Sequence, residues 1–137
     1  MQIFYDFVFK MDTLRKFLSS IRTTGAVVPY TDSSIEKILW STDRSQTKNI
    51  VEYWPGLGWF TTYILKHCAQ DAHLTCFEIN KEDFWPGLDA LDDERLTIYY
   101  TTCEDIRKYI SDYIIDLIVS TIPFSLIGKE TSLNIIN

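Results

Sequence analysis

A run of glycine and acidic residues in the first half of the chain has the spacing of a nucleotide-binding turn. Residues 51–60 read V-E-Y-W-P-G-L-G-W-F. Gly56 and Gly58 allow the backbone to approach a ligand where a Cβ atom would collide with it. Glu78 follows Gly58 by twenty residues, a distance at which an acidic side chain can accept hydrogen bonds from both hydroxyls of a ribose. These residue types and spacings predict a nucleoside site.

Apolar runs around this turn predict the strands that would position it. The four runs lie at residues 48–53, 73–77, 96–100 and 114–120. Each is short, and the last is apolar enough to be buried on both faces of a sheet. The second run ends next to Glu78, which places this carboxylate at the carboxyl end of a strand.

Helices are predicted between these strands and after the last of them. They cover residues 61–66 directly after the turn, residues 103–113, and the segment from Ser125 to the last residue. Another helix begins at Ser33, because Ser33 and Glu36 have the spacing of a capping box. Strands that alternate with helices predict an α/β fold with a parallel sheet, helices on both of its faces and right-handed crossovers.

The amino-terminal segment predicts an amphipathic helix. Its apolar residues recur at steps of three and four, at Phe4, Phe7, Met11, Leu14, Leu18 and Ile21. Residues 1–22 hold four basic and two acidic residues, which gives them a net charge of +2. Because the whole chain has a net charge of −6, the rest of the chain has a net charge of −8. This stripe packs on the body of the domain or on a second copy, or it lies on a membrane surface. We predict a helical cap segment at 1–47 and a cofactor-binding body at 48–137.

Composition narrows the class of protein. The chain has 137 residues, of which 46% are hydrophobic, and predicts one globular unit. Its net charge of −6 argues against a nucleic-acid binder. The three cysteines form no C-x-x-C pair, which predicts a reducing compartment and no metal site. We read the chain as cytoplasmic, since it shows no signal peptide and no apolar run long enough to span a bilayer.

Four stretches of this sequence resemble the class I S-adenosylmethionine-dependent methyltransferases. Within that class the chain looks most like the phospholipid N-methyltransferase-like group, which is related to the rRNA adenine dimethylases. The resemblance runs from about Phe17 to the end and rests on F-L…G-A-V-V-P (17–29), the turn (51–58), F-E-I-N (77–80) and the run that ends S-T-I-P-F (116–124). It implies a Rossmann-like fold, here with about four strands of the family's seven, and S-adenosyl-L-methionine as cofactor.

The resemblance also implies roles for individual residues. Glu52 helps to hold the loop and the methionine amino group, Gly56 and Gly58 line the cofactor, and Glu78 binds the ribose. Further contacts with the cofactor are implied for Ile79, Thr102, Cys103 and Ser120. Pro123 and Phe124 would lie where the methyl group is transferred. Tyr30 is a candidate to assist deprotonation of an amine acceptor, or it is simply a surface tyrosine beside a turn.

Trp54 stands where the family pattern has its first glycine. An indole there should crowd the methionine end of the cofactor or force the turn into another shape. Three functions therefore remain open. The first is methyl transfer to an amine, with a phosphatidylethanolamine-like lipid as the acceptor. The second is a non-catalytic, degenerate or fragmentary module of the same fold, and the third is RNA adenine methylation. A homo-oligomer could cover the apolar edge left by the fourth strand.

Overall fold

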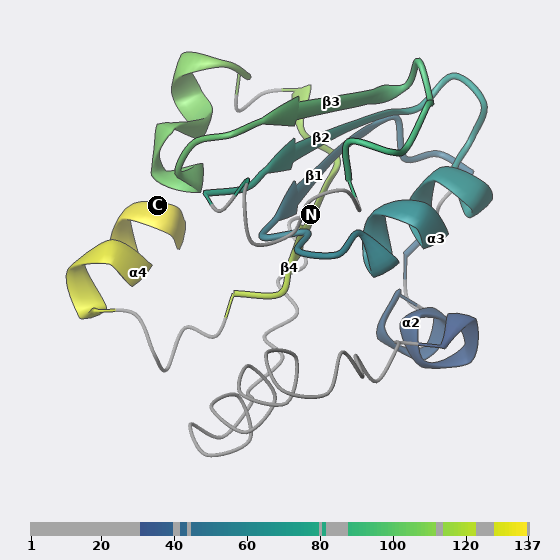
Figure 1. Cartoon of the computed structure of the whole chain (residues 1–137), viewed down its shortest axis with the longest axis horizontal. Coiled ribbons are helices and arrows are strands. Elements are labelled where there is room, and N and C mark those ends of the chain that lie inside the picture. Colours follow the sequence, from purple (N-terminus) through teal and green to yellow (C-terminus); the bar gives the residue numbers. More distant parts are fainter. Residues whose placement is uncertain are drawn as a thin grey trace.

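The protein is built on one four-stranded parallel sheet. The structure, a computed structural model, describes residues 31–39, 42–43, 45–79, 81, 88–111, 114–122 and 128–136. The strands are β1 (Asn49–Tyr53), β2 (His73–Phe77), β3 (Leu96–Tyr99) and β4 (Leu117–Ser120). Their order in the sheet is β3-β2-β1-β4, and all three pairings are parallel (Figure 1). The predicted parallel α/β sheet is confirmed.

Helices cover both faces of this sheet. They are α2 (Asp32–Leu39), α3 (Trp59–His67), the 3-10 helix η1 (Cys103–Lys108) and α4 (Lys129–Ile136). In Figure 1, α2 and α3 lie together on the right, whereas η1 (green) and α4 lie on the left. Figure 1 thus shows the two pairs of helices separated by the strands.

Alternation along the strands divides the core into two layers. In β1, Ile50 packs with residues of α2 and α3, while Val51 and Tyr53 pack with Cys103 of η1 and Ile135 of α4. Successive side chains of a strand point to opposite faces, so a five-residue strand serves both layers. All four residues of β4 are buried, as the continuous apolar run predicted.

Several predicted boundaries differ from the structure, including those of the fourth strand and of the helix over 103–113. The fourth strand begins at Leu117 instead of Ile114. Ahead of it, the carboxylate of Asp116 accepts hydrogen bonds from the backbone N–H groups of Lys48 (2.9 Å) and Asn49 (2.8 Å). The predicted helix over 103–113 is a 3-10 helix that ends at Lys108. Its ends are closed by i to i+3 bonds, such as that from Tyr109 N–H to the Ile106 carbonyl at 2.9 Å.

Helix α2 begins one residue earlier than its predicted capping box. Its first turn is capped by Thr31, whose hydroxyl oxygen accepts the N–H of Ser34 at 3.2 Å. Ile35 and Leu39 of this helix are each 1% exposed and belong to the same core layer as α3. The division between a cap at 1–47 and a body at 48–137 stays a prediction.

Several predicted elements lie outside the described residues. These are the amphipathic segment 1–22, Tyr30, Pro123 and Phe124. Within the described part of the chain, β4 is an edge strand because it pairs only with β1.

Candidate functional site

The candidate site lies along the carboxyl edge of the sheet. Eight residues singled out from the sequence are described, and all of them fall at or just after the ends of strands. Glu52, Gly56 and Gly58 belong to the end of β1 and the following loop, Glu78 and Ile79 follow β2, Thr102 and Cys103 follow β3, and Ser120 ends β4. Because the strands are parallel, these positions share one edge, which is where open α/β sheets bind their ligands.

The loop after β1 has a left-handed backbone at three positions. The φ angles are +56° at Trp54, +57° at Gly56 and +81° at Gly58. Glycine adopts this conformation without steric cost, whereas a residue with a Cβ does so at a cost of roughly 1 to 2 kcal/mol. The backbone of Trp54 therefore has the left-handed conformation that favours glycine, although this residue carries a large side chain.

Contacts on both sides hold Trp54 in this conformation. Its N–H donates to the carbonyl of Phe77 at 3.0 Å, and its carbonyl accepts the hydroxyl of Thr121 at 2.6 Å. The half-buried side chain packs against the core layer that includes Ile122 and Ile135. Trp54 thus joins the ends of three strands, β1, β2 and β4.

Gly58 is required by close packing within the chain. A Cβ atom on Gly58 would lie 3.1 Å from Cδ2 of Leu88, which is a tight contact. Gly58 is also the left-handed residue that precedes α3, and its carbonyl accepts the N–H of Thr62 at 2.9 Å. Gly58 thus allows Leu88 to pack closely against the loop, and a contact between Gly58 and a cofactor stays a prediction.

Glu52 lies beneath the loop and is fully buried, with 0% of its surface exposed. Its Oε2 accepts the hydroxyl of Thr61 in α3 at 2.6 Å and the thiol of Cys76 in β2 at 3.5 Å. Its Oε1 is buried and has no hydrogen-bond partner among the described residues. Burial raises the pKa of Glu52 to about 7, although the hydrogen bonds from Thr61 and Cys76 act in the opposite direction.

Glu78 is the second buried carboxyl group beside the loop, with 2% of its surface exposed. Its Oε2 accepts the backbone N–H of Gly56 at 3.1 Å. The side chain thus fixes the middle of the loop to the end of β2. Its negative charge also contributes to the raised pKa of Glu52. A contact between Glu78 and a ribose stays a prediction.

The remaining predicted site residues have different surroundings. Ile79 is 48% exposed, whereas Cys103 is 2% exposed and packs in the core layer beneath η1. Burial raises the pKa of the Cys103 thiol to about 12, so this thiol is neutral at pH 7. Thr102 caps η1 by accepting the N–H of Glu104 at 3.3 Å, and Ser120 Oγ accepts the N–H of Ile122 at 3.3 Å.

Sequence reasoning missed several residues at this edge. Thr61 and Cys76 hold Glu52, and Thr121 holds Trp54. Beside the ends of β2 and β3, the hydroxyl of Tyr100 donates to Asp89, and the Lys81 ammonium lies 4.8 Å from the centre of the Tyr100 ring. No motif marked these residues, since each contact depends on the register of neighbouring strands or on a long loop.

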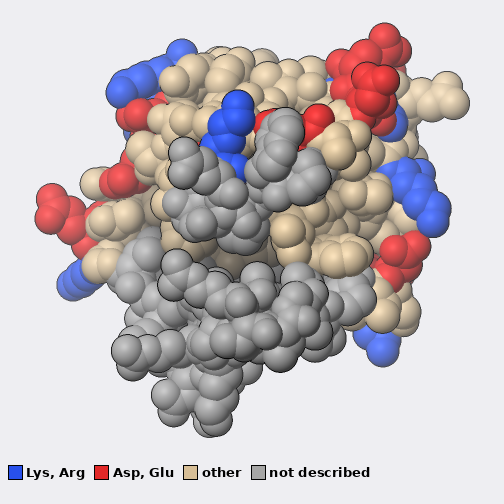
Figure 2. All heavy atoms as spheres, in the orientation of Figure 1, with Lys and Arg blue, Asp and Glu red and all other residues tan. Residues whose placement is uncertain are grey.

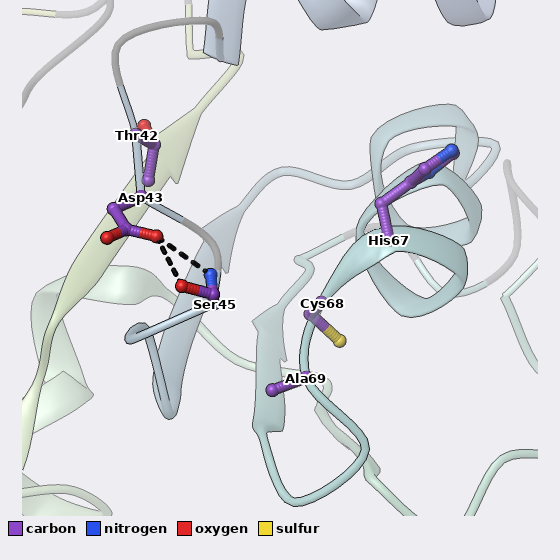
Figure 3. Close-up of a pocket in the computed structure, with 6 residues that line it drawn as sticks. All are labelled: Thr42, Asp43, Ser45, His67, Cys68 and Ala69. Carbon is purple, nitrogen blue, oxygen red and sulfur yellow. Dashed lines mark hydrogen bonds between the residues drawn. The ribbon is translucent and has the colours of Figure 1, made fainter.

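A cavity of about 510 Å³ lies away from this edge (Figure 3). It is lined by Thr42, Asp43, Ser45, His67, Cys68 and Ala69, which precede β1 or close α3. Two of its polar side chains are engaged: Asp43 Oδ1 accepts the hydroxyl of Ser45 at 2.6 Å, and His67 Nδ1 lies 2.8 Å from the Tyr63 carbonyl oxygen. The hydroxyl oxygen of Thr42 is buried and has no hydrogen-bond partner among the described residues.

The described surface bears charges of both signs. In the view of Figure 2, acidic and basic side chains lie near one another around the face. Across the described ranges, no three His, Cys, Asp or Glu side chains are placed to hold a metal ion. No helix in those ranges is long and apolar enough to cross a membrane.

Among known proteins, only solved structures resemble this chain, and they resemble it in fold. No family model and no curated protein sequence matches the chain. A putative O-methyltransferase from Klebsiella pneumoniae aligns at a TM-score of 0.54 and 17% identity over 82% of this chain and 54% of that one. A SAM-dependent methyltransferase from Aquifex aeolicus aligns at 0.52 and 15% over 78% and 65%. A protein from Corynebacterium glutamicum aligns at 0.51 and 15% over 82% and 55%.

These likenesses define the class of fold. The chain has the Rossmann-like fold of the class I methyltransferases, with four parallel strands and helices on both faces. It spans between about half and two thirds of the length of the proteins it matches. The resemblance to the phospholipid N-methyltransferase-like group is finer than this likeness and stays a prediction.

Proposed function

We propose that this chain binds S-adenosylmethionine at the carboxyl edge of its sheet and supports methyl transfer. One observation carries the proposal: two buried carboxyl groups, Glu52 and Glu78, flank a loop with left-handed backbone at Trp54, Gly56 and Gly58. Oε1 of Glu52 is buried and has no hydrogen-bond partner among the described residues, which is costly unless a ligand or a proton compensates it. The residues therefore fit a ligand that brings hydrogen-bond donors and positive charge.

Each carboxyl group has a separate task in this proposal. Glu78 would bind the ribose hydroxyls while it keeps Gly56 in place, and Glu52 would face the amino group of the methionine part. The exposed Ile79 would lie against the adenine, and Thr102 and Ser120 would border the cofactor at the ends of β3 and β4. When bound, the cofactor supplies an activated methyl group on a sulfonium, so the chain has to orient the acceptor and exclude water.

Titration calorimetry with S-adenosylhomocysteine tests this function. We expect a dissociation constant in the micromolar range, about −8 kcal/mol. Glu78→Gln should weaken binding by at least tenfold, since it removes a charged acceptor from the ribose site and from the Gly56 N–H. Glu94→Gln is the matched control, because it makes the same charge change on an exposed turn. Equal affinity of the two variants would contradict the assigned site, and no binding by the parent chain would contradict the function.

The acceptor that we propose is an amine on a phospholipid headgroup. The support is the basic amphipathic pattern of residues 1–22 beside an acidic remainder. Transfer of labelled methyl groups to vesicles of phosphatidylethanolamine, with vesicles of fully methylated phosphatidylcholine as the control, tests it. Label in neither lipid, together with label in a hydroxyl-bearing small molecule, would replace the amine by an oxygen acceptor.

A non-catalytic module of the same fold is the second candidate. Trp54 favours it, because a bulky side chain stands at a glycine position of the cofactor loop. This candidate predicts that the parent chain fails to bind S-adenosylhomocysteine and that Trp54→Gly binds it. Binding by the parent chain would dismiss the argument from Trp54.

A further inference from the structure

Two buried carboxyl groups stand at the carboxyl ends of neighbouring strands, on either side of the loop after β1. Glu52 is the fourth residue of β1, and Glu78 directly follows β2. The two strands are neighbours in register, with Glu52 opposite Cys76. Both side chains are nearly or fully buried. Burial disfavours the charged form of Glu52, and the negative charge of Glu78 adds to this effect, so both favour a proton on Glu52.

Hydrogen bonding distinguishes the two groups. Glu78 accepts a backbone N–H from Gly56 at 3.1 Å, which stabilises its charged form. Glu52 accepts two bonds at Oε2, while its Oε1 is buried with no partner in the described part of the chain. If Glu52 were ionised, its Oε1 would lose its hydration on burial and gain no hydrogen bond from the described residues in exchange. A proton on Glu52 removes that penalty.

Among the described residues, the groups that face Glu52 bring no positive charge. Thr61 of α3 is a neutral hydroxyl, and Cys76 of β2 is a thiol whose pKa burial raises well above its ordinary value. Glu78, at the end of β2, is acidic. The raised pKa of Glu52, at about 7, agrees with this arrangement.

We propose that Glu52 carries a proton before the cofactor binds and releases that proton to the solvent as the ammonium group of the methionine part enters. This inference rests on the proposed function. The Glu52 O–H bond breaks, the proton passes to the buffer, and the carboxylate left behind pairs with the ammonium group of the ligand. Protons and cofactor therefore compete for the same buried group.

This competition makes cofactor affinity depend on pH. The ammonium group of the ligand stabilises the carboxylate and lowers its pKa, so the affinity rises with pH until Glu52 is ionised before binding. With a pKa of about 7 before binding, the association constant for S-adenosylhomocysteine should rise about eightfold from pH 6 to pH 7.5. In Glu52→Gln, which cannot ionise, it should stay constant within about twofold.

Calorimetry at pH 6 in phosphate and in bis-Tris measures the released proton directly, because the two buffers differ in their enthalpy of ionisation. The parent chain should release close to one proton per S-adenosylhomocysteine bound. Adenosine is the matched ligand control, since it keeps the base and the sugar but has no ammonium group, and it should release none. Adenosine binding also shows whether Glu52→Gln has kept its folded site.

The outcomes separate this inference from the proposed function. An eightfold rise with one proton released by the parent chain, both absent in Glu52→Gln, would support it. Binding of S-adenosylhomocysteine with constant affinity and no proton release would overturn the inference and leave the function standing. Equal proton release with adenosine would also overturn it. If neither pH gives binding, the proposed function fails and this inference fails with it.

Discussion

The hydroxyl of Thr121 donates a hydrogen bond of 2.6 Å to the carbonyl oxygen of Trp54. This bond ties the residue after β1 to the residue after β4, across the two strands between which the strand order reverses. Ligands of open α/β sheets bind in the crevice at such a point. The Thr121–Trp54 contact therefore sets the shape of the sheet edge where a cofactor would lie.

Removing the Thr121 hydroxyl should destabilise the protein. Thr121→Val keeps the shape of the side chain but leaves the Trp54 carbonyl without its donor, and we expect a loss of about 1 kcal/mol in the free energy of unfolding. Thr121→Ser is the control, because it keeps the hydroxyl and removes only a methyl group. Urea denaturation followed by tryptophan fluorescence measures both variants. Equal stability of Val and Ser variants would show that this bond adds nothing.

The left-handed backbone at Trp54 predicts an unusual ranking of substitutions. Trp54→Ala and Trp54→Gly both remove the indole and its packing, and they differ only by a Cβ atom on a backbone with φ of +56°. The glycine variant should be the more stable by about 1 kcal/mol, although glycine usually destabilises relative to alanine. Chemical denaturation of the two purified variants checks the order. A more stable alanine variant would mean that this conformation is not kept in solution.

The burial of Glu52 predicts a pH-dependent stability. Its pKa of about 7 in the folded chain lies above the ordinary 4.5, so the folded state binds the proton more tightly than the unfolded state does. The contribution of Glu52 is therefore most favourable below pH 4.5 and is lost as pH rises through 7. Relative to Glu52→Gln, the parent chain should lose about 2 kcal/mol of unfolding free energy between pH 5 and pH 8.

Thermal or urea unfolding of the parent chain and of Glu52→Gln at both pH values measures this difference. The change in unfolding free energy between the two pH values is compared between the two proteins. Any packing effect of the substitution is the same at both pH values and therefore cancels. A difference between the two proteins that is the same at pH 5 and pH 8 would show that Glu52 does not titrate between these values.

Arg95 should stabilise the folded chain more than the exposed Lys66 does. Its guanidinium donates to the carbonyl oxygens of Leu65 at 2.7 Å and Ala69 at 3.4 Å, at the carboxyl end of α3, and also binds Asp93 at 2.7 Å. Arg95→Ala should cost about 1 to 2 kcal/mol of unfolding free energy. Lys66→Ala is the matched control: it breaks an exposed ion pair with Asp32 at 3.3 Å, and such pairs contribute about 0.5 kcal/mol or less.

Urea denaturation of the two variants under the same conditions measures the contrast. An equal loss in Lys66→Ala and Arg95→Ala would show that the carbonyl contacts of Arg95 add no stability beyond a surface ion pair.

The sequence by itself determined the architecture. The strand at 73–77 was predicted with its observed bounds, and the strand at 96–100 ended one residue too late. The loop at 54–58 and the carboxylate after the second strand were also predicted. These features are local, because apolar runs, glycine spacing and the residue after a strand are all read from neighbours in the chain. For the same reason, the predicted fourth strand begins at Ile114, three residues before the observed strand, because Ile114 and Ile115 are apolar.

Only the tertiary structure decided which groups meet at the candidate site. Thr121 and Trp54 are 67 residues apart in the chain, and Asp116 binds N–H groups 67 and 68 positions away. Glu52 is 24 residues from Cys76 and becomes its partner because β1 and β2 pair in register. Composition and periodicity determine which residues are buried. The surroundings of Glu52, whose Oε1 has no partner in the described part of the chain, and the strained backbone of Trp54 follow from the register of the strands and from the crossovers that join them.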